Sequence, residues 1–265
     1  MSGHSKWHSI KHKKAATDAK KGKIFTKHAK LVAIAARKGG DPFTNPALRA
    51  AIDNAKAENM PVDNIERAIK KGTGEGKDAA QFSEVIYEAR GPAGVALLIE
   101  ALTDNKNRTV SDLKTLLTKQ GAALGAAGAV AYLFQRKGLI TAPLKAVEDP
   151  ESKKAPPPPQ TKTPDEIELA AIDAGADDVR IIGPTDSNGS INSPDEIEIY
   201  TDPSALMQVR SALNTAGVKT GKAVLTYIPT QEVEVADEET AQKVFDLIEA
   251  IEDNDDVNTV YHNMK

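Results

Sequence analysis

Three histidines near the start of the chain have a spacing that could bind a metal. His4, His8 and His12 recur every four residues, which would align three imidazoles on one face of a helix. The surrounding lysines repel a cation, and residues 1–17 contain no Asp, Glu or Cys that could complete the ligand set. These histidines are therefore expected to make polar contacts, and no metal or other cofactor is predicted.

Other candidate catalytic patterns are also incomplete. The segment KGTGEGK, Lys71 to Lys77, has too few residues between its glycines for a phosphate-binding loop, and an acid follows its last lysine. The acid pairs Asp177-Asp178 and Asp255-Asp256 are predicted to lie in exposed turns, where carboxylates rarely do acid–base chemistry. There is no cysteine and no Ser in a G-x-S-x-G setting. We expect a protein that is not an enzyme.

Lysines give the strongest chemical signal in the chain. Residues 1–40 hold eleven Lys and Arg against Asp18, a net charge of 11 − 1 = +10 in a chain of −4, so the remaining residues carry −14. Dense, one-sided positive charge is typical of a surface that binds a polyanion, although it also fits a solvated basic face. The candidate phosphate-binding residues are Lys6, Lys11, Lys13, Lys14, Lys20, Lys21, Lys23, Lys27, Lys30, Arg37 and Lys38.

The kind of contact follows from the residue types. Ten Lys to one Arg favour contact with the phosphate backbone over reading of base edges. Trp7 is the only tryptophan, and it could either stack on an unpaired base or fold back onto the protein. Further candidates on a downstream helix are Arg67, Lys70 and Lys71.

Composition places the chain among soluble globular proteins. It has 265 residues, 40% of them hydrophobic and 27% charged, and its apolar runs are too short to cross a bilayer. No signal or transit peptide pattern precedes the basic segment. We expect a cytoplasmic protein that does not contact membranes.

The amino-terminal third predicts an arm followed by three helices. Residues 4–14 lack an apolar stripe, whereas a helical pattern begins at Thr17 and stops at Gly39-Gly40. Asn45-Pro46 predicts the start of a second helix, and Pro61 that of a third, with Gly72 beyond its end. Short helices of this kind are stable only when packed together, so a small bundle is predicted.

The remainder predicts two mixed units joined by a linker. The first has strands 82–90 and 95–103 around the turn 91–94, followed by a helix from Thr109. Residues 121–129 have too little side chain to pack a core and are predicted to form a mobile loop, and a strand is predicted at 131–136. A Pro-rich linker, 148–164, precedes the second unit. That unit has helices 165–174 and 204–216 and strands 179–182, 196–201 and 223–228.

The carboxyl-terminal residues are strongly acidic. Residues 231–265 hold two Lys and eleven acids, a net charge of 2 − 11 = −9, and predict a helix at 239–251 and a strand at 257–261. His262 would lie near a disordered end. These acids could form an internal counterweight to the basic arm or a solvated face.

Four segments carry a resemblance to a known family. They are GHSKW (3–7), IKHKKAATDAKKGKIFTK (10–27), NPALRAAIDNAKAENMPVDNIERAIKKG (45–72) and TDNKNRT (103–109), which resemble the YebC family, including the translational activators of cytochrome c oxidase I. The resemblance implies an α+β protein: an N-terminal three-helix bundle followed by two α+β sandwich lobes, the third domain inserted into the second. The implied domains are residues 1–77, residues 78–138 with 229–265, and residues 139–228, so that the acidic end completes the middle sheet.

The resemblance also implies function. Family members are labelled DNA-binding transcriptional regulators or ribosome-associated translation factors acting at proline-rich stretches. We therefore expect a monomeric, nucleic-acid-binding regulator of gene expression, with DNA or ribosomal RNA as partner and a possible place on the ribosome. The alternative is a protein-interaction adaptor that uses the acidic lobes.

Overall fold

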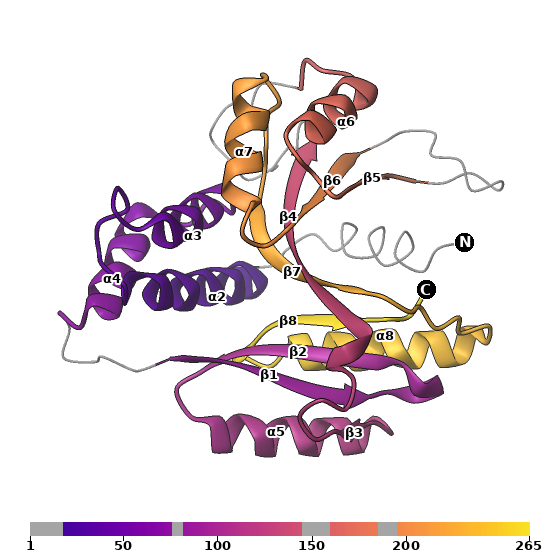
Figure 1. Cartoon of the computed structure of the whole chain (residues 1–265). Helices are drawn as coiled ribbons and strands as arrows, with labels where there is room; N and C mark the ends of the chain where they lie inside the picture. Colours follow the sequence, from indigo (N-terminus) through magenta and orange to yellow (C-terminus); the bar gives the residue numbers. More distant parts are fainter. Residues whose placement is uncertain (1–17, 76–81, 145–159, 185–194) are drawn as a thin grey trace. The chain divides into compact units, whose positions relative to one another are not determined.

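The protein is a mixed α+β structure that divides into two compact units. The computed structural model describes residues 18–75, 82–144, 160–184 and 195–265, and within residues 18–21 only the backbone (Figure 1). Residues 136–226 form one unit, and residues 16–135 with 227–265 form the other. Two four-stranded sheets are present in the described ranges, which confirms the predicted α+β class. The predicted arm, the linker core 145–159 and the loop 185–194 lie outside the described residues.

The larger unit contains the predicted three helices, α2 Asp18–Ala36, α3 Pro46–Ala57 and α4 Val62–Thr73. Helix α3 begins as predicted, because the Asn45 side chain accepts a hydrogen bond from the Leu48 N–H and Pro46 needs no N–H partner. The three helices bury one apolar cluster, as short amphipathic helices must. Its members are Val32, Ala36, Leu48, Ile52, Ala55, Met60, Ile65 and Ala68.

The predicted end of the third helix is wrong. Gly72 lies inside α4, which ends at Thr73; the cap residue Gly74 adopts a left-handed conformation with φ 81°. A Cβ atom on Gly72 would collide with the Ala33 carbonyl and would lie 2.7 Å from the Ala36 Cβ. Gly72 therefore permits close packing of α4 on α2 and does not end the helix.

The same unit contains a sheet in the order β3-β1-β2-β8. Its strands are β3 Ala123–Leu124, β1 Ser83–Arg90, β2 Ala96–Thr103 and β8 Val257–His262. The last strand pairs antiparallel with β2, which confirms that the chain's end completes the middle sheet. His262 is 6% exposed, so its predicted place at a disordered end is wrong. Helices α5 Lys106–Lys119 and α8 Glu238–Glu252 belong to this unit, and α5 begins three residues earlier than predicted.

The Gly- and Ala-rich segment 121–129 is more ordered than predicted. The carboxylate of Glu88, which is 7% exposed, accepts backbone N–H bonds from Gly128 and Val130 at 2.6 Å and from Ala131 at 2.8 Å. Burial raises the pKa of Glu88, but these three donors outweigh it, so the pKa lies below its ordinary value. The loop is therefore organised by one buried carboxylate, and Val130 is fully buried beside it.

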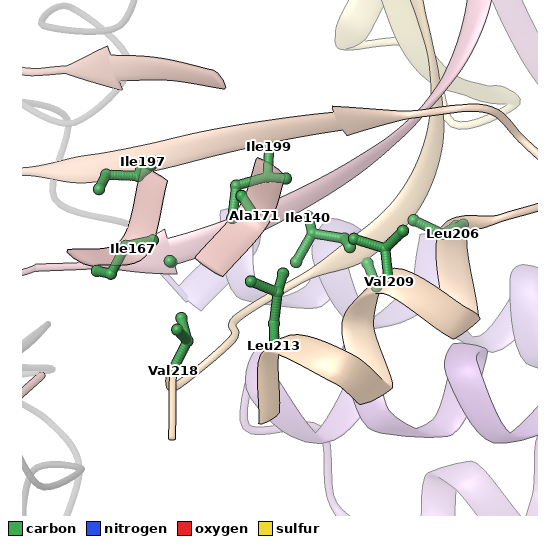
Figure 2. Close-up of a cluster of buried hydrophobic side chains, with 11 residues drawn as sticks. Ile140, Ile167, Ala171, Ile197, Ile199, Leu206, Val209, Leu213 and Val218 are labelled. Atoms are coloured by element: carbon green, nitrogen blue, oxygen red, sulfur yellow. The ribbon is translucent and has the colours of Figure 1, made fainter. Parts of the chain in front are cut away.

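The smaller unit has a sheet in the order β5-β6-β4-β7 with two helices. The predicted strand 131–136 is confirmed at residues 134–136 only, because residues 131–133 form a 3₁₀ turn. The strand was predicted in the first mixed unit, but it pairs with β6 of the smaller unit. Figure 2 shows Ile140, Ile197 and Ile199 of the sheet beside Ile167 and Leu213 of the helices, all fully buried. The elements are β4 Phe134–Pro143, α6 Pro164–Asp173, β5 Asp178–Ile182, β6 Glu196–Thr201, α7 Leu206–Thr215 and β7 Ala223–Pro229.

Two further points bear on function. Among the helices in the described ranges, none has the length and apolar character that a bilayer crossing requires. The division at residues 77, 138 and 228 into three domains stays a prediction, since contacts separate the chain into two units only.

The close approach at Gly72 gives a test of the bundle. We expect Gly72→Ala to lower the free energy of unfolding by about 1–3 kcal/mol, because the added methyl forces α4 away from α2. Gly22→Ala is the matched control: no atom lies within 4 Å of its Cβ position, and alanine favours helix by up to about 1 kcal/mol. Urea unfolding followed by circular dichroism measures both. Equal effects of the two substitutions would contradict the packing described here.

Candidate nucleic-acid interface

The structure describes about half of the predicted phosphate-binding side chains. Lys6, Trp7, Lys11, Lys13 and Lys14 lie outside the described residues, and for Lys20 and Lys21 only the helical backbone is described. The others lie on α2, on the turn after it and on α4. They are Lys23, Lys27, Lys30, Arg37, Lys38, Arg67, Lys70 and Lys71.

Three of these lysines lie on one face of α2 and contact the acidic end of the chain. The Lys23 Nζ lies 3.1 Å from a carboxylate oxygen of Asp253. The Lys27 Nζ donates to the carbonyls of Glu252 and Asn258, at 3.4 and 3.2 Å. Because residues 23, 27 and 30 are spaced by four and three, one helix face presents all three ammonium groups to the segment 252–258.

Lys30 reaches deepest, to the carboxylate of Asp256. Its Nζ lies 3.2 Å from Asp256 Oδ1 and also donates to the carbonyls of Leu102 and Asp255, at 3.0 and 2.8 Å. The side chains of Lys30 and Asp256 are only 11% and 10% exposed. This ion pair is therefore part of the interior of the larger unit.

The second oxygen of Asp256 binds the TDNKNRT segment. Asp256 Oδ2 accepts from Arg108 at 2.8 Å, from the Thr109 hydroxyl at 2.8 Å and from the Thr103 hydroxyl at 3.3 Å. The Asn105 side chain caps α5 by accepting from the Arg108 N–H. Four side-chain donors thus surround one buried carboxylate, and we call Asp256 with Lys30, Thr103, Arg108 and Thr109 the Asp256 cluster.

The Asp256 cluster holds its carboxylate ionised. Burial raises the pKa of Asp256, but the bonds from Arg108, Thr109 and Lys30 outweigh it, so the pKa lies below its ordinary value. The prediction that Asp255-Asp256 lies in an exposed turn is wrong for Asp256, which is 7% exposed. A carboxylate with a lowered pKa has no proton to donate near neutral pH, so this burial indicates a structural role.

A cleft of about 490 Å³ opens beside the Asp256 cluster. Its charged lining residues balance, with three cations and three acids giving 3 − 3 = 0. A polyanion gains little from a neutral surface, so this cleft does not extend the phosphate-binding surface. The charged residues are Lys23, Lys30, Arg108, Asp104, Asp255 and Asp256.

The exposed cations of the described bundle are Arg37, Lys38, Arg49, Lys56, Arg67 and Lys70. The guanidinium of Arg67 donates to the Asp63 carbonyl at 3.3 Å and to the Asn64 side chain, so part of its hydrogen-bonding capacity is used within α4. The Lys71 Nζ lies 4.8 Å from the centre of the Phe82 ring and is less available. The described helices therefore present lysine ammonium groups to solvent, and few arginine guanidinium groups that are free to make bidentate contacts with base edges.

Comparison with known proteins decides the family. The model described as TACO1/YebC protein N-terminal domain matches residues 5–75, and the one described as TACO1/YebC second and third domain matches residues 82–264. The chain belongs to the TACO1/YebC family. The resemblance inferred from the sequence is thereby confirmed.

Relatives extend this assignment over the whole chain. A probable transcriptional regulatory protein of Persephonella marina is 47% identical over 267 residues, covering 100% of this chain and 96% of its own. One of Thermosipho melanesiensis is 48% identical over 264 residues, covering 99% of this chain and 93% of its own. The crystal structure of a conserved hypothetical protein from Aquifex aeolicus has a TM-score of 0.80 at 44% identity, covering 97% of this chain and 95% of that one. This TACO1/YebC protein is accordingly a regulator by family. Among its described residues, no three or more His, Asp or Glu side chains are grouped so that they could hold a metal ion.

Sequence reasoning missed the Asp256 cluster, although two signals for it were present. The lysines of α2 have helical spacing, and the carboxyl-terminal residues are strongly acidic. Asp253 and Asp256 pair with Lys23 and Lys30 of α2, whereas the predicted counterweight to the arm concerns residues outside the described ranges. The pairing partners could not be chosen from sequence, because more than 220 residues separate them.

Removing only the charge of Asp256 should greatly reduce the stability of the protein. We expect Asp256→Asn to lower the free energy of unfolding by about 3 kcal/mol, because Lys30 would keep a buried charge without its counter-ion. Asp253→Asn is the control: its pair with Lys23 is exposed and contributes less than about 1 kcal/mol. Urea unfolding at neutral pH compares them. Equal destabilisation by both would show that burial of the Asp256 carboxylate is not the cause.

The stabilisation by Asp256 should also depend on pH. Because the folded pKa of Asp256 is lowered, its stabilisation is present above the ordinary carboxyl pKa, about 4, and is lost as pH falls through the folded value. The difference in unfolding free energy between wild type and Asp256→Asn should therefore be largest near neutral pH and shrink under acid conditions. Urea unfolding across this pH range measures the difference, and a constant value would contradict the assignment.

Proposed function

We propose that this protein regulates gene expression by binding nucleic acid through the phosphate backbone, using its Lys-rich amino-terminal segment. The observation that carries the proposal is the net charge of +10 over residues 1–40 in a chain of −4. Three of the eleven cations there, Lys23, Lys27 and Lys30, contact the acidic end of the chain. The remaining 11 − 3 = 8 are the candidates for phosphate contact, and Arg67 and Lys70 extend the surface.

Backbone contact is favoured over sequence reading. Each Lys that neutralises a phosphate releases a counterion, which gives strong, salt-sensitive affinity with little base preference. The eight remaining cations include one arginine, Arg37, so few bidentate contacts to guanine are available. The protein would bind by charge and shape.

Folded RNA suits this surface at least as well as duplex DNA. Compact RNA brings phosphates of several strands close together, so a dense run of lysines can neutralise many at once. We therefore place ribosomal RNA on the cytoplasmic ribosome first, with action at proline-rich stretches as the family resemblance implies. Duplex DNA is the second candidate, and the regulatory names of the relatives support it.

Neutralising the first lysines tests the proposal. Replacing Lys6, Lys11, Lys13 and Lys14 together by Gln should weaken binding to ribosomes or DNA and reduce the slope of log affinity against log salt by about 3. The control replaces four exposed lysines elsewhere, Lys106, Lys114, Lys119 and Lys265, with the same change in net charge. Salt titrations of filter binding measure both.

The outcome separates the candidate functions. Greater loss on ribosomes than on duplex DNA would favour RNA as the target, and the reverse would favour DNA. A binding affinity that changes neither with the amino-terminal substitutions nor with salt concentration would contradict the proposal and favour the protein-interaction adaptor. Crosslinking in cells, with sequencing of the attached nucleic acid, would identify the target.

A further inference from the structure

Phe43 is the most exposed large apolar side chain in the described part of the protein, at 86%. It lies in the loop 37–45 between α2 and α3. Single exposed apolar residues are ordinary on protein surfaces, so exposure alone carries no argument. Two further features distinguish Phe43: its backbone is held in place, and the sequence segment that carries it has a positive net charge.

Hydrogen bonds on both sides fix the backbone at Phe43. Its N–H donates to the Asp41 carboxylate at 2.9 Å. The Arg49 guanidinium donates to the carbonyls of Pro42 and Phe43, at 2.9 and 3.0 Å. The buried Asn45 amide closes the loop by donating to the carbonyls of Ala35 and Gly39, at 2.8 Å each. The ring therefore extends into solvent from a restrained backbone, which reduces the entropy lost when it contacts a ligand.

The sequence segment that carries Phe43 has a positive net charge, whereas Glu66 and Glu75 line a hollow beside Gly40 and Asp41. Residues 37–49 hold Arg37, Lys38 and Arg49 against Asp41, a net charge of 3 − 1 = +2. The contrast is α6, whose exposed Leu169 and Ile172 lie in a helix with four acids and no Lys or Arg. A polyanion would approach Phe43 and avoid α6.

We propose that Phe43 stacks on an unpaired base of the bound nucleic acid, while Arg37 and Lys38 contact the neighbouring phosphates. The inference rests on the proposed function and adds a ligand class to it, a single-stranded or looped segment. An aromatic ring presented among cations is the arrangement that single-strand sites use, because every base offers a flat face whatever its sequence. A base inside a duplex has both faces covered by its neighbours, so Phe43 contributes only where a base is unstacked.

The test compares single-stranded and duplex RNA. Fluorescence anisotropy with a short labelled oligoadenylate, and with an RNA duplex of the same length, would use the full chain. Phe43→Ala should weaken oligoadenylate binding about tenfold and leave duplex binding unchanged. Phe43→Trp should retain wild-type affinity, whereas Phe43→Leu, which is apolar but lacks the aromatic face, should behave like Phe43→Ala. Leu169→Ala is the control at a comparably exposed apolar residue in acidic surroundings, and it should change nothing.

Several results would overturn the inference. Unchanged oligoadenylate binding by Phe43→Ala, with salt-sensitive wild-type binding intact, would reject stacking and leave the proposed function standing. Full affinity in Phe43→Leu would show an apolar contact that needs no aromatic ring. Equal loss on duplex RNA would reject the preference for an unpaired base. Wild-type protein that binds neither RNA nor DNA would reject the inference and the proposed function together.

Discussion

The larger unit depends on the ionised carboxylate of Asp256, buried between three segments of the chain. A buried charge is tolerated only when charged and hydrogen-bonding partners surround it. Here the partners come from α2, which supplies Lys30, and from the TDNKNRT segment, which supplies Arg108, Thr109 and Thr103. The requirement to compensate one carboxylate therefore holds the basic helix against the carboxyl-terminal segment that precedes β8.

This constraint divides the lysines of the basic segment by location. Along α2, Lys23, Lys27 and Lys30 contact the segment 252–258, while the turn that follows α2 carries the exposed Arg37 and Lys38. In the sequence these five cations belong to one basic segment. In the fold, three of them contact the acidic segment 252–258 and two are exposed to solvent. A count of positive residues overstates the surface open to phosphate, because part of that charge is neutralised within the protein.

Features set by neighbouring residues could be predicted, and those set by distant ones could not. The cap at Asn45 and the start of α3 follow from local chemistry, and the α+β order follows from periodicity. Gly72 was misread because a glycine that permits close helix packing has the same sequence signature as one that ends a helix. The loop 121–129 was misread because its order comes from Glu88, a carboxylate on another strand. The burial of Asp256 could not be predicted either, because its partners Lys30 and Arg108 lie far from it in the sequence.

The depth of each internal ion pair decides which lysines can exchange partners with a nucleic acid. Lys30, at 11% exposure, cannot move to a phosphate without breaking its buried ion pair with Asp256, which costs several kcal/mol. Lys23 is 41% exposed and its partner Asp253 is 68% exposed, so water can replace either group at little cost. In the proposed complex, Lys23 at the beginning of α2 could therefore join the eight candidate cations while Lys30 stays in place. The boundary of the phosphate-binding surface would then fall between these two lysines, about two turns apart on one helix.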